Sequence, residues 1–453
     1  MHTWDAQLEE LASSVVRYAS ERARLDKDPR WGARSADELT AALADVVAPE
    51  GIGGDAALEV FKNVILPACR PNDDPLMVSY VPTAPTPAAV LFDMVVSASS
   101  IFAGHWEAGA GAIAAENQAL RWIMDIADFP PEAGGVFVSG GTAANLSALV
   151  TARESWHASN PERGMGTRLA VAATKNAHAS IDVVARVMGV EVLPVDADDR
   201  GRLTTQALEQ ALAAADPALT PFAVVASAGT TNSGAIDDLP ALAPFCKERQ
   251  LWLHVDAAYG GAALASPRYR GLLNGIEQAD SFGIDPHKWL FAPYDCAAVL
   301  YQQPELAAAA HSQHGDYLGY IERAESNPSD LALHLTRRAR GLPLWFSLAA
   351  NGTSAYAEAI DTTMDTASAV AESVRSIDGL ELAVAPRLSV VLFRRTGWEE
   401  DDYVAWSERN AAAGTALIVP TRWDGEVCMR VCIVNPLTDA ARLHEILLDM
   451  AAA

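Results

Sequence analysis

The chain has 453 residues and a net charge of −25, with half of its residues hydrophobic and a fifth charged. This length allows about two or three domains with substantial cores. Nucleic acid is excluded as a partner by the strong negative charge and the lack of basic patches, because phosphate backbones are bound by clustered Lys and Arg. No apolar run reaches the roughly 18 residues that a membrane span needs, so we expect no membrane partner.

The charged, amphipathic start of the chain is not typical of a signal peptide. Five cysteines form no C-x-x-C pair, so we expect neither disulfides nor a zinc site, and we expect a reducing, cytoplasmic compartment. Cys428 and Cys432 lie in an apolar strand and are expected in the core. His311 and His314 form an H-x-x-H pair, which we interpret as two solvated loop residues, and no metal is expected.

The N-terminal part of the chain, residues 1–87, is predicted to be helical and then extended. Residues 1–48 have the pattern of two helices broken around Asp28-Pro29. Residues 67–87 contain six prolines and are expected to be irregular.

Residues 88–346 begin with a predicted helix over 88–102 and then alternate short apolar runs with helical patterns. Near-continuous apolar strands separated by helices predict an α/β domain, with a mostly parallel central sheet covered by helices on both faces. Such sheets bind ligands at the carboxyl ends of their strands. The expected strands are 135–139, 168–174, 190–196, 221–229, 251–258, 280–286 and 297–303, and the expected helices between them are 142–156, 178–188, 204–215 and 239–249.

The pattern changes near residue 346. A long helix is predicted over 347–377, followed by mixed strands and helices, with helices at 400–413 and 438–451. We therefore expect residues 347–453 to form a small α+β domain.

Lys288 is one of only five lysines in the chain and lies in the apolar segment DSFGIDPHKWLFAPYDC. A lysine on a turn is usually solvated, but apolar flanks and a strand end make that interpretation weaker here. A desolvated ammonium is expected to have a lowered pKa, which frees the amine for Schiff-base chemistry.

Asp256 ends the apolar strand of LWLHVDAAYGG. A carboxylate at the end of a buried strand is costly unless it is paired. Either it caps the next turn, or it meets a cation while the small Ala258 leaves room for a flat ring.

Two further segments follow strands. In GVFVSGGTAANLSALV, the turn at Gly140, Gly141 and Thr142 precedes a helix, which suits a phosphate, although an ordinary N-cap has the same pattern. In ATKNAHASID, His178 opens a helix and is either a cap or core residue or a ring stacked on a flat cofactor.

Pyridoxal phosphate (PLP) accounts for all four segments, because it has a phosphate, a flat ring, a pyridine nitrogen and an aldehyde.

The segments HVDAAYGG, DPHKWL and NAHASID together resemble the group II PLP-dependent decarboxylases, which include aromatic-L-amino-acid and glutamate decarboxylases. The resemblance extends from about residue 67 to the strand MRVCIVNP. It implies the aspartate-aminotransferase-like fold (fold type I), a homodimer with shared active sites, and decarboxylation of an L-amino acid. The apolar faces of the N-terminal helices make residues 1–87 the expected dimerisation segment.

The resemblance also assigns roles to individual residues. It implies that Lys288 forms the Schiff base, that Asp256 pairs with the pyridine nitrogen and that His178 stacks on the ring. The remaining cofactor contacts that it implies are the phosphate ligands Thr142 and His287 beside Gly140 and Gly141, Ala258 against the ring and Thr230 near its polar edge.

The segment SYVPTAP resembles the substrate pocket of aromatic decarboxylases, and no arginine in these segments is placed to bind a second carboxylate. We therefore expect an aromatic substrate, with core or dimer packing as the other interpretation of these aromatic residues. The expected substrate residues are Tyr80, Pro82, Thr83, Trp106 and Tyr294.

The family's mobile loop corresponds to residues 311–330, and its proton-donating tyrosine aligns near Pro328. Tyr317, or else Tyr320, is the candidate donor if the loop is gapped. Members without this tyrosine can be aldehyde synthases. Oxidative deamination, transamination, carbon–sulfur cleavage, an acidic or diamino-acid substrate and a cofactor-dead scaffold are the alternatives.

Overall fold

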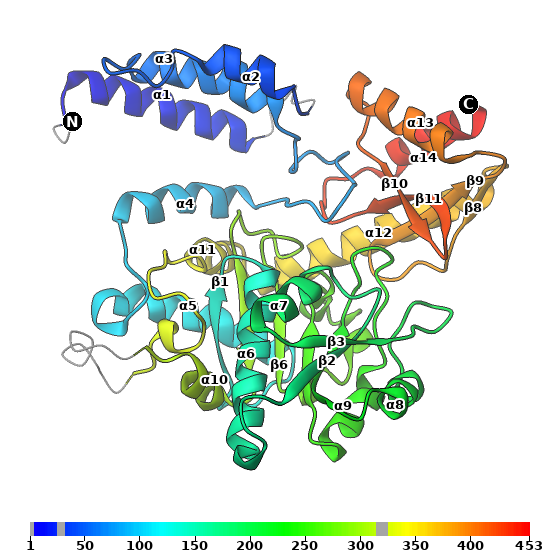
Figure 1. The fold of residues 1–453 in the computed structure, drawn as a ribbon. Helices are drawn as coiled ribbons and strands as arrows, with labels where there is room; N and C mark the ends of the chain where they lie inside the picture. Colours follow the sequence, from blue (N-terminus) through cyan, green and yellow to red (C-terminus); the bar gives the residue numbers. More distant parts are fainter. Residues whose placement is uncertain (1–3, 25–31, 314–324) are drawn as a thin grey trace.

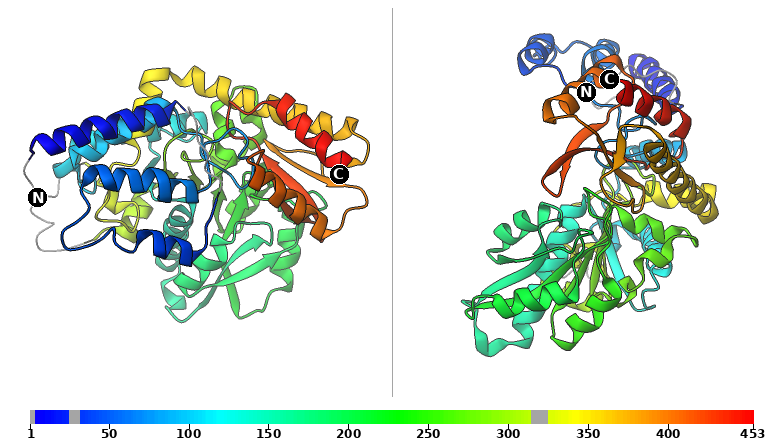
Figure 2. Two further views of the ribbon diagram at one scale, coloured as in Figure 1. Left: turned by 90° about the horizontal axis from the view of Figure 1, so that it is seen from above. Right: turned by 90° about the vertical axis from the view of Figure 1, so that its right-hand side faces the viewer.

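The computed structural model describes residues 4–24, 32–313 and 325–453. A large α/β domain forms one layer of the molecule, and the N-terminal helices and the C-terminal domain lie on the same side of it (Figures 1 and 2). Within the described ranges, no helix has both the length and the apolarity to cross a bilayer.

The large domain is built on a seven-stranded sheet with the order β1-β7-β6-β5-β4-β2-β3. Only β7 runs against its neighbours, since β1 and β6 both pair with it in the antiparallel sense and the other pairs are parallel. The predicted mostly parallel sheet is therefore confirmed. Its strands are β1 (Gly134–Val138), β2 (Arg168–Thr174), β3 (Glu191–Val195), β4 (Leu219–Ser227), β5 (Trp252–Asp256), β6 (Ser281–Ile284) and β7 (Ala297–Tyr301).

Helices cover both faces of this sheet because its central strands are apolar on both sides. Every residue of β5, β6 and β7 is buried. One core lies under α6 (Gly141–Ser159), α7 (Ser180–Met188) and α10 (Pro304–His311). The core on the other face is covered by α5 (Trp106–Ile126), α8 (Thr205–Ala214), α9 (Leu239–Glu248) and part of α12 (Thr353–Ser376).

The N-terminal arm consists of α1 (Ala6–Ala23), α2 (Ala36–Leu43) and α3 (Gly54–Val60), and α4 (Pro87–Ser99) follows it. The two predicted helices are present, and the proposed break at Asp28-Pro29 lies outside the described residues. The short helix α3 was not predicted. None of the residues of α1, α2 or α3 is buried, so the arm has no core of its own.

The single helix predicted over 347–377 is wrong, because the chain forms α11 (Leu342–Asn351) and α12 with Gly352 between them. Gly352 has a φ of 77°, a conformation that favours glycine and ends the first helix. After α12, a four-stranded antiparallel sheet with the order β10-β11-β9-β8 forms the small domain. Its elements are β8 (Leu380–Leu382), β9 (Val390–Arg395), α13 (Glu400–Ala413), β10 (Val419–Trp423), β11 (Glu426–Cys432) and α14 (Ala440–Ala452).

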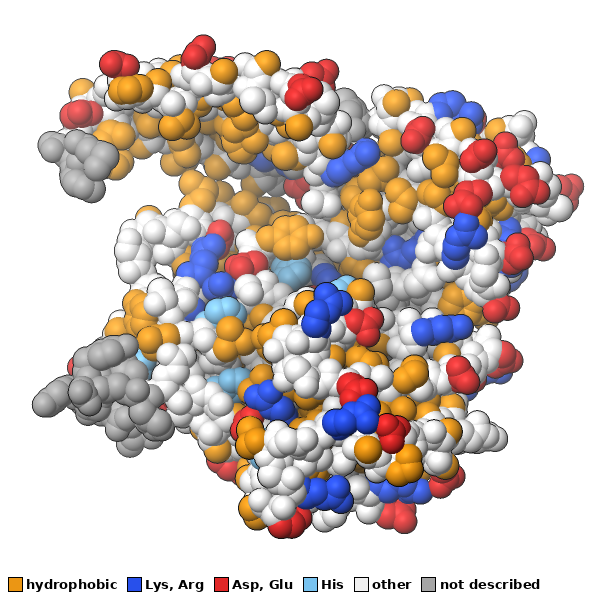
Figure 3. All heavy atoms as spheres, in the orientation of Figure 1, with side chains coloured by type: hydrophobic (Ala, Val, Ile, Leu, Met, Phe, Trp, Pro, Cys, Tyr) orange, Lys and Arg blue, Asp and Glu red, His pale blue; other side chains and the backbone are white. Residues whose placement is uncertain are grey.

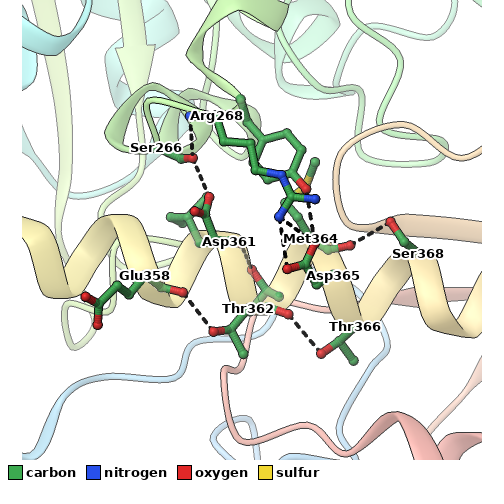
Figure 4. Close-up of polar contacts among 12 residues, drawn as sticks. Ser266, Arg268, Glu358, Asp361, Thr362, Met364, Asp365, Thr366 and Ser368 are labelled. Atoms are coloured by element: carbon green, nitrogen blue, oxygen red, sulfur yellow. Dashed lines mark hydrogen bonds and ion pairs between the residues drawn. The ribbon is translucent and has the colours of Figure 1, made fainter.

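Helix α12 joins the two domains. Tyr356 and Ile360 near its start belong to the large-domain core, whereas Val370 and Val374 belong to the core of the small domain. On the large-domain side, a polar seam fixes the helix: Asp361 accepts a hydrogen bond from Ser266, and Arg268 Nη1 lies 2.8 Å from Asp365 Oδ1 (Figure 4). The position of the small domain is thereby tied to the large sheet.

His311, which we expected to be solvated, is buried at the end of α10. That expectation is wrong because α10 packs on α6, where His311 Nε2 lies 3.0 Å from Ser147 O and 3.2 Å from Thr151 Oγ1. His314 lies outside the described residues. Cys428 and Cys432 are buried, as predicted.

Candidate active site

The carboxyl ends of the parallel strands surround a cavity of about 200 Å³. Among its lining residues are Gly141, Thr142, His178, Thr230, Asp256, Ala258 and Lys288, all of which the sequence singled out. Gly140 is the N-cap of α6, and the buried His287 directly precedes Lys288. The turn after each strand thus brings residues that are far apart in the sequence to one edge of the sheet.

Asp256, at the end of β5, is 8% exposed. Its Oδ1 accepts a hydrogen bond from the backbone N–H of Ala258 at 3.1 Å, and its Oδ2 accepts one from Asn145 Nδ2 at 3.0 Å. Both donors are neutral, so neither of them brings a positive charge to this carboxyl group at the cavity wall. Such a group stabilises a positive charge placed opposite it.

Behind Asp256 runs a chain of hydrogen bonds between buried side chains. The indole of Trp252 can only donate, and it does so to Ser281 Oγ at 2.9 Å. Ser281 Oγ, whose own proton remains available to donate, lies 2.9 Å from His254 Nδ1. His254 Nε2–H in turn donates to Asn145 Oδ1 at 2.9 Å, which turns the Asn145 amide group toward Asp256. Burial keeps His254 neutral, with its proton on Nε2 and its Nδ1 as the acceptor from Ser281.

The same chain fixes the proton of His178. The backbone N–H of Ser180 donates to His178 Nδ1 at 3.2 Å, so this nitrogen carries no proton. Ser180 Oγ accepts from Asn145 Nδ2 at 3.0 Å and lies 2.8 Å from the same His178 nitrogen. The proton of His178 is therefore on Nε2, where it is available as a donor in the cavity.

The neutral state of His254 has a consequence for stability. Burial lowers the pKa of His254 to about 4, against the opposing effect of Asp256. The unfolded chain takes up this proton near pH 6.5, so the stability that depends on neutral His254 is complete above that pH and is lost as the pH falls toward 4. Between pH 7 and pH 5 the loss from this group amounts to about 2 kcal/mol of unfolding free energy.

We expect His254→Gln to lose less of its unfolding free energy than wild type between pH 7 and pH 5, because glutamine does not titrate. Urea unfolding with saturating cofactor at each pH measures the difference. His444→Gln, a substitution on α14, serves as the control and should retain the wild-type slope. An equal slope in His254→Gln and wild type contradicts the assignment.

Lys288 is held by a carboxylate that the sequence analysis missed. Its Nζ lies 2.9 Å from Asp285 Oδ2. Burial lowers the pKa of Lys288, but Asp285 and Asp256 outweigh burial, and the net pKa is raised. The expected lowering of this pKa is therefore wrong for the protein without its cofactor. Asp285 stands in the DPHKW segment three positions before Lys288, so the signal was present in the sequence.

The start of α6 is suited to a phosphate. No side chain among the described residues caps this helix, and its N-cap is Gly140. A Cβ on Gly141 would lie 3.1 Å from Asp285 Oδ2 and 3.4 Å from the Ala258 side chain, so only glycine leaves this space open. His287 Nδ1 accepts a hydrogen bond from the Cys296 N–H at 3.2 Å, which leaves its Nε2–H free to donate. The residues present therefore fit PLP: a phosphate cradle, a carboxylate for the ring nitrogen and an amine.

Thr230 also lines the cavity, and its hydroxyl is held in place. Its Oγ1 accepts a hydrogen bond from the Ala235 N–H at 3.1 Å and lies 3.1 Å from Ser233 Oγ.

The structure brings the expected substrate residues together only in part. Tyr294 packs on His287 with the ring centroids 5.0 Å apart, next to the cavity. Pro82 is buried, and Thr83 Oγ1 donates to Ala292 O at 3.1 Å. Trp106 begins α5, where Asn327 caps its N–H at 2.9 Å. None of the five substrate residues, all within the described ranges, is among those that line the cavity around Lys288. Tyr317 and Tyr320 lie outside the described residues.

Arg430, in β11, is a second residue that the sequence analysis did not single out. It donates to three backbone carbonyls: Tyr80 O and Thr231 O at 2.6 Å each, and Asn232 O at 3.1 Å. This guanidinium joins the segment of Tyr80 to the loop beside Thr230. Only the folded chain brings these segments together.

The fold and the chemistry of this cavity define a PLP-dependent enzyme. The sequence profile described as the pyridoxal-dependent decarboxylase conserved domain matches residues 43–396, and the chain belongs to this family. It is accordingly a PLP-dependent carboxy-lyase that acts on amino acids.

Relatives with different substrates resemble the chain to a similar degree. An aromatic-L-amino-acid decarboxylase of Bacillus atrophaeus is 31% identical and covers 84% of this chain and 81% of its own. An L-2,4-diaminobutyrate decarboxylase of Rhizobium meliloti is 33% identical over 79% of this chain and 74% of its own. The crystal structure of Oryza sativa TDC with PLP and tryptamine, 24% identical, superposes with a TM-score of 0.90 over 100% of this chain and 99% of that one, which confirms the predicted fold.

Proposed function

We propose that this enzyme decarboxylates an aromatic L-amino acid to its amine and carbon dioxide. The observation that carries the proposal is the charge of the cavity: among the described residues that line it, Lys288 is the only Lys or Arg. An acidic substrate needs a second cation for its side-chain carboxylate. Tyr294, beside His287, offers instead an aromatic surface on which a flat side chain can pack.

When bound, PLP supplies an electron sink for bond breaking at the α-carbon of the substrate. Lys288 holds the cofactor covalently, and Asp256 keeps the proton on its pyridine nitrogen. His178 lies against the ring and presents its Nε2–H to the substrate. Gly140, Gly141, Thr142 and His287 bind the phosphate, while Ala258 contacts the ring and Thr230 its polar edge.

Tyr317, or else Tyr320, is proposed to return a proton to the substrate carbon. An aldehyde synthase is the alternative if neither tyrosine does so. Product analysis separates the two, since a decarboxylase releases the amine and a synthase releases the aldehyde. We expect Tyr317→Phe to lower amine formation.

We expect tyrosine, tryptophan or dihydroxyphenylalanine to be turned over with a higher kcat/KM than glutamate, aspartate or 2,4-diaminobutyrate. Released carbon dioxide measures turnover for the whole set under one condition. The assay includes 2,4-diaminobutyrate because an L-2,4-diaminobutyrate decarboxylase is 33% identical to this chain. Preference for an acidic or diamino substrate would show that the pocket assignment is wrong, while the cofactor chemistry stands.

We also propose a homodimer in which residues 1–87 of one subunit cover the other and the active sites are shared. None of the residues of α1, α2 or α3 is buried, and the hydrophobic side chains of this arm border a hollow (Figure 3). Val16 on α1 is 53% exposed and Val95 on α4 is 52% exposed. An apolar cavity of about 900 Å³ lies between α1, α4 and α12. Apolar surface of this extent usually marks an interface between proteins.

The mass in solution tests the dimer. We expect analytical ultracentrifugation to give about twice the chain mass of 48.0 kDa. The double substitution Val16→Glu with Val95→Glu should shift the protein toward the monomer, whereas Val404→Glu on α13 should leave the dimer intact. A folded, active monomer at micromolar concentration would exclude the shared site.

We also propose a cytoplasmic location for the protein. Its five cysteines, all within the described ranges, are unbridged, which supports this proposal.

A further inference from the structure

Asp285 is a buried carboxylate with one oxygen unused. It follows β6 directly, is 3% exposed, and its backbone N–H donates to Ala258 O at 3.1 Å. Its Oδ2 lies 2.9 Å from Lys288 Nζ. Its Oδ1 is buried and has no hydrogen-bond partner within the described part of the chain. A buried polar atom without a partner is rare, and a bound group at this place would satisfy it.

The free oxygen lies against the proposed phosphate cradle. A Cβ built on Gly141 would be 3.3 Å from Asp285 Oδ1 and 3.1 Å from its Oδ2, so the carboxyl group faces the first turn of α6. A phosphate at this helix N-terminus would therefore meet a carboxyl group as well as backbone N–H groups. If both were ionised, two anions would share a buried site.

Lys288 no longer offers a free ammonium group to Asp285 once the cofactor is in place. Its amino group condenses with the cofactor's aldehyde, with loss of one water, and leaves its place beside the carboxylate. Among the described residues that line the cavity, no other Lys or Arg can replace it. A buried carboxylate left without its cation is strongly destabilised unless it is protonated.

The other titratable groups around Asp285 provide no positive charge. His287 Nε2 is 3.7 Å from Asp285 Oδ2, but burial lowers the pKa of this histidine, and its Nδ1 accepts a hydrogen bond. Burial raises the pKa values of Tyr294 and Cys296, which therefore stay neutral. The remaining carboxylate, Asp256, is held by Asn145 and Ala258.

We propose that Asp285 takes up one proton when the cofactor binds and donates the resulting O–H to the cofactor's phosphate. The proton comes from the Lys288 ammonium, 2.9 Å away, which must lose one proton before its amine condenses with the aldehyde and releases one water. The inference depends on the phosphate cradle proposed above but not on the identity of the substrate. It makes Asp285 a phosphate ligand in the acid form and the partner of Lys288 in the ionised form. The acid form of Asp285 belongs to the protein with bound cofactor, and the ionised form belongs to the protein without it.

Infrared difference spectra between holoprotein and apoprotein test the proposal. We expect the addition of PLP to wild type to produce the carbonyl band of a protonated carboxylic acid. This band should shift in heavy water and in protein grown with isotope-labelled aspartate. It should be lost in Asp285→Asn. Asp280→Asn makes the same change at the opposite end of β6 and should retain the band.

The visible absorbance of the bound cofactor is recorded on the same samples, which separates a failure to bind PLP from a failure of this inference. If labelled wild-type protein binds PLP without a protonated aspartate band, Asp285 stays ionised and the proposal is wrong. A band that persists in Asp285→Asn also overturns it. Because wild type alone decides the first outcome, the test holds even if the variant does not fold.

Discussion

Replacing Lys288 by alanine is expected to abolish turnover while leaving a folded protein that still binds PLP without a covalent bond. In the proposed site, the lysine supplies the amine that exchanges with the substrate, whereas the start of α6 and the ring contacts supply most of the affinity. The Lys288 side chain lies at the cavity wall and is 21% exposed, so its truncation leaves no large void in the core.

Borohydride reduction of wild-type holoprotein, followed by peptide mapping, identifies the lysine that carries the cofactor. We expect the label on Lys288 alone. Lys247→Ala, an exposed lysine on α9, is the matched control and should keep full activity. A label on any other lysine, or turnover by Lys288→Ala, would contradict the assignment.

The second large effect is expected for Asp256→Asn. The amide cannot hold a proton on the pyridine nitrogen, so the electron sink weakens, and kcat should fall on the order of 100- to 1,000-fold, as when one electrostatic stabiliser is removed. Asparagine has nearly the same shape, and its oxygen can still accept the hydrogen bond from Ala258, so that only the hydrogen bond from Asn145 is lost. The fold should therefore survive.

Steady-state kinetics and the visible spectrum of bound PLP measure this effect. The control is Asp196→Asn, because Asp196 also follows a parallel strand of the sheet but is exposed. Its kcat should match wild type. A near-normal kcat for Asp256→Asn would place the partner of the ring nitrogen elsewhere.

Asp285 connects these two predictions. In Lys288→Ala the carboxyl group loses its only cation in the described structure, as we propose that it does when the cofactor binds. Protonation of Asp285 would let the variant tolerate that loss. A folded Lys288→Ala protein is therefore consistent with the proposed change of Asp285 between its ionised and acid forms.

The sequence by itself determined the architecture and most of the cavity. Apolar runs alternating with helical patterns are local signals, and they placed all seven strands of the large sheet within a few residues. Because parallel strands end at one edge, the residues that follow β1, β2, β5 and β6 had to meet there. Asp256, Lys288, His178 and the Gly140–Thr142 turn were found in this way.

The tertiary structure alone decided which partners these residues have. Arg430 reaches Tyr80 across 350 positions of sequence, and His254 reaches Asn145 across 109. The burial of His311 against α6 likewise depends on how two helices pack. A pattern of residue types records which side chains are apolar or titratable. The proton on His178 and the raised pKa of Lys288 depend instead on distances of about 3 Å between groups that only the packed chain brings together.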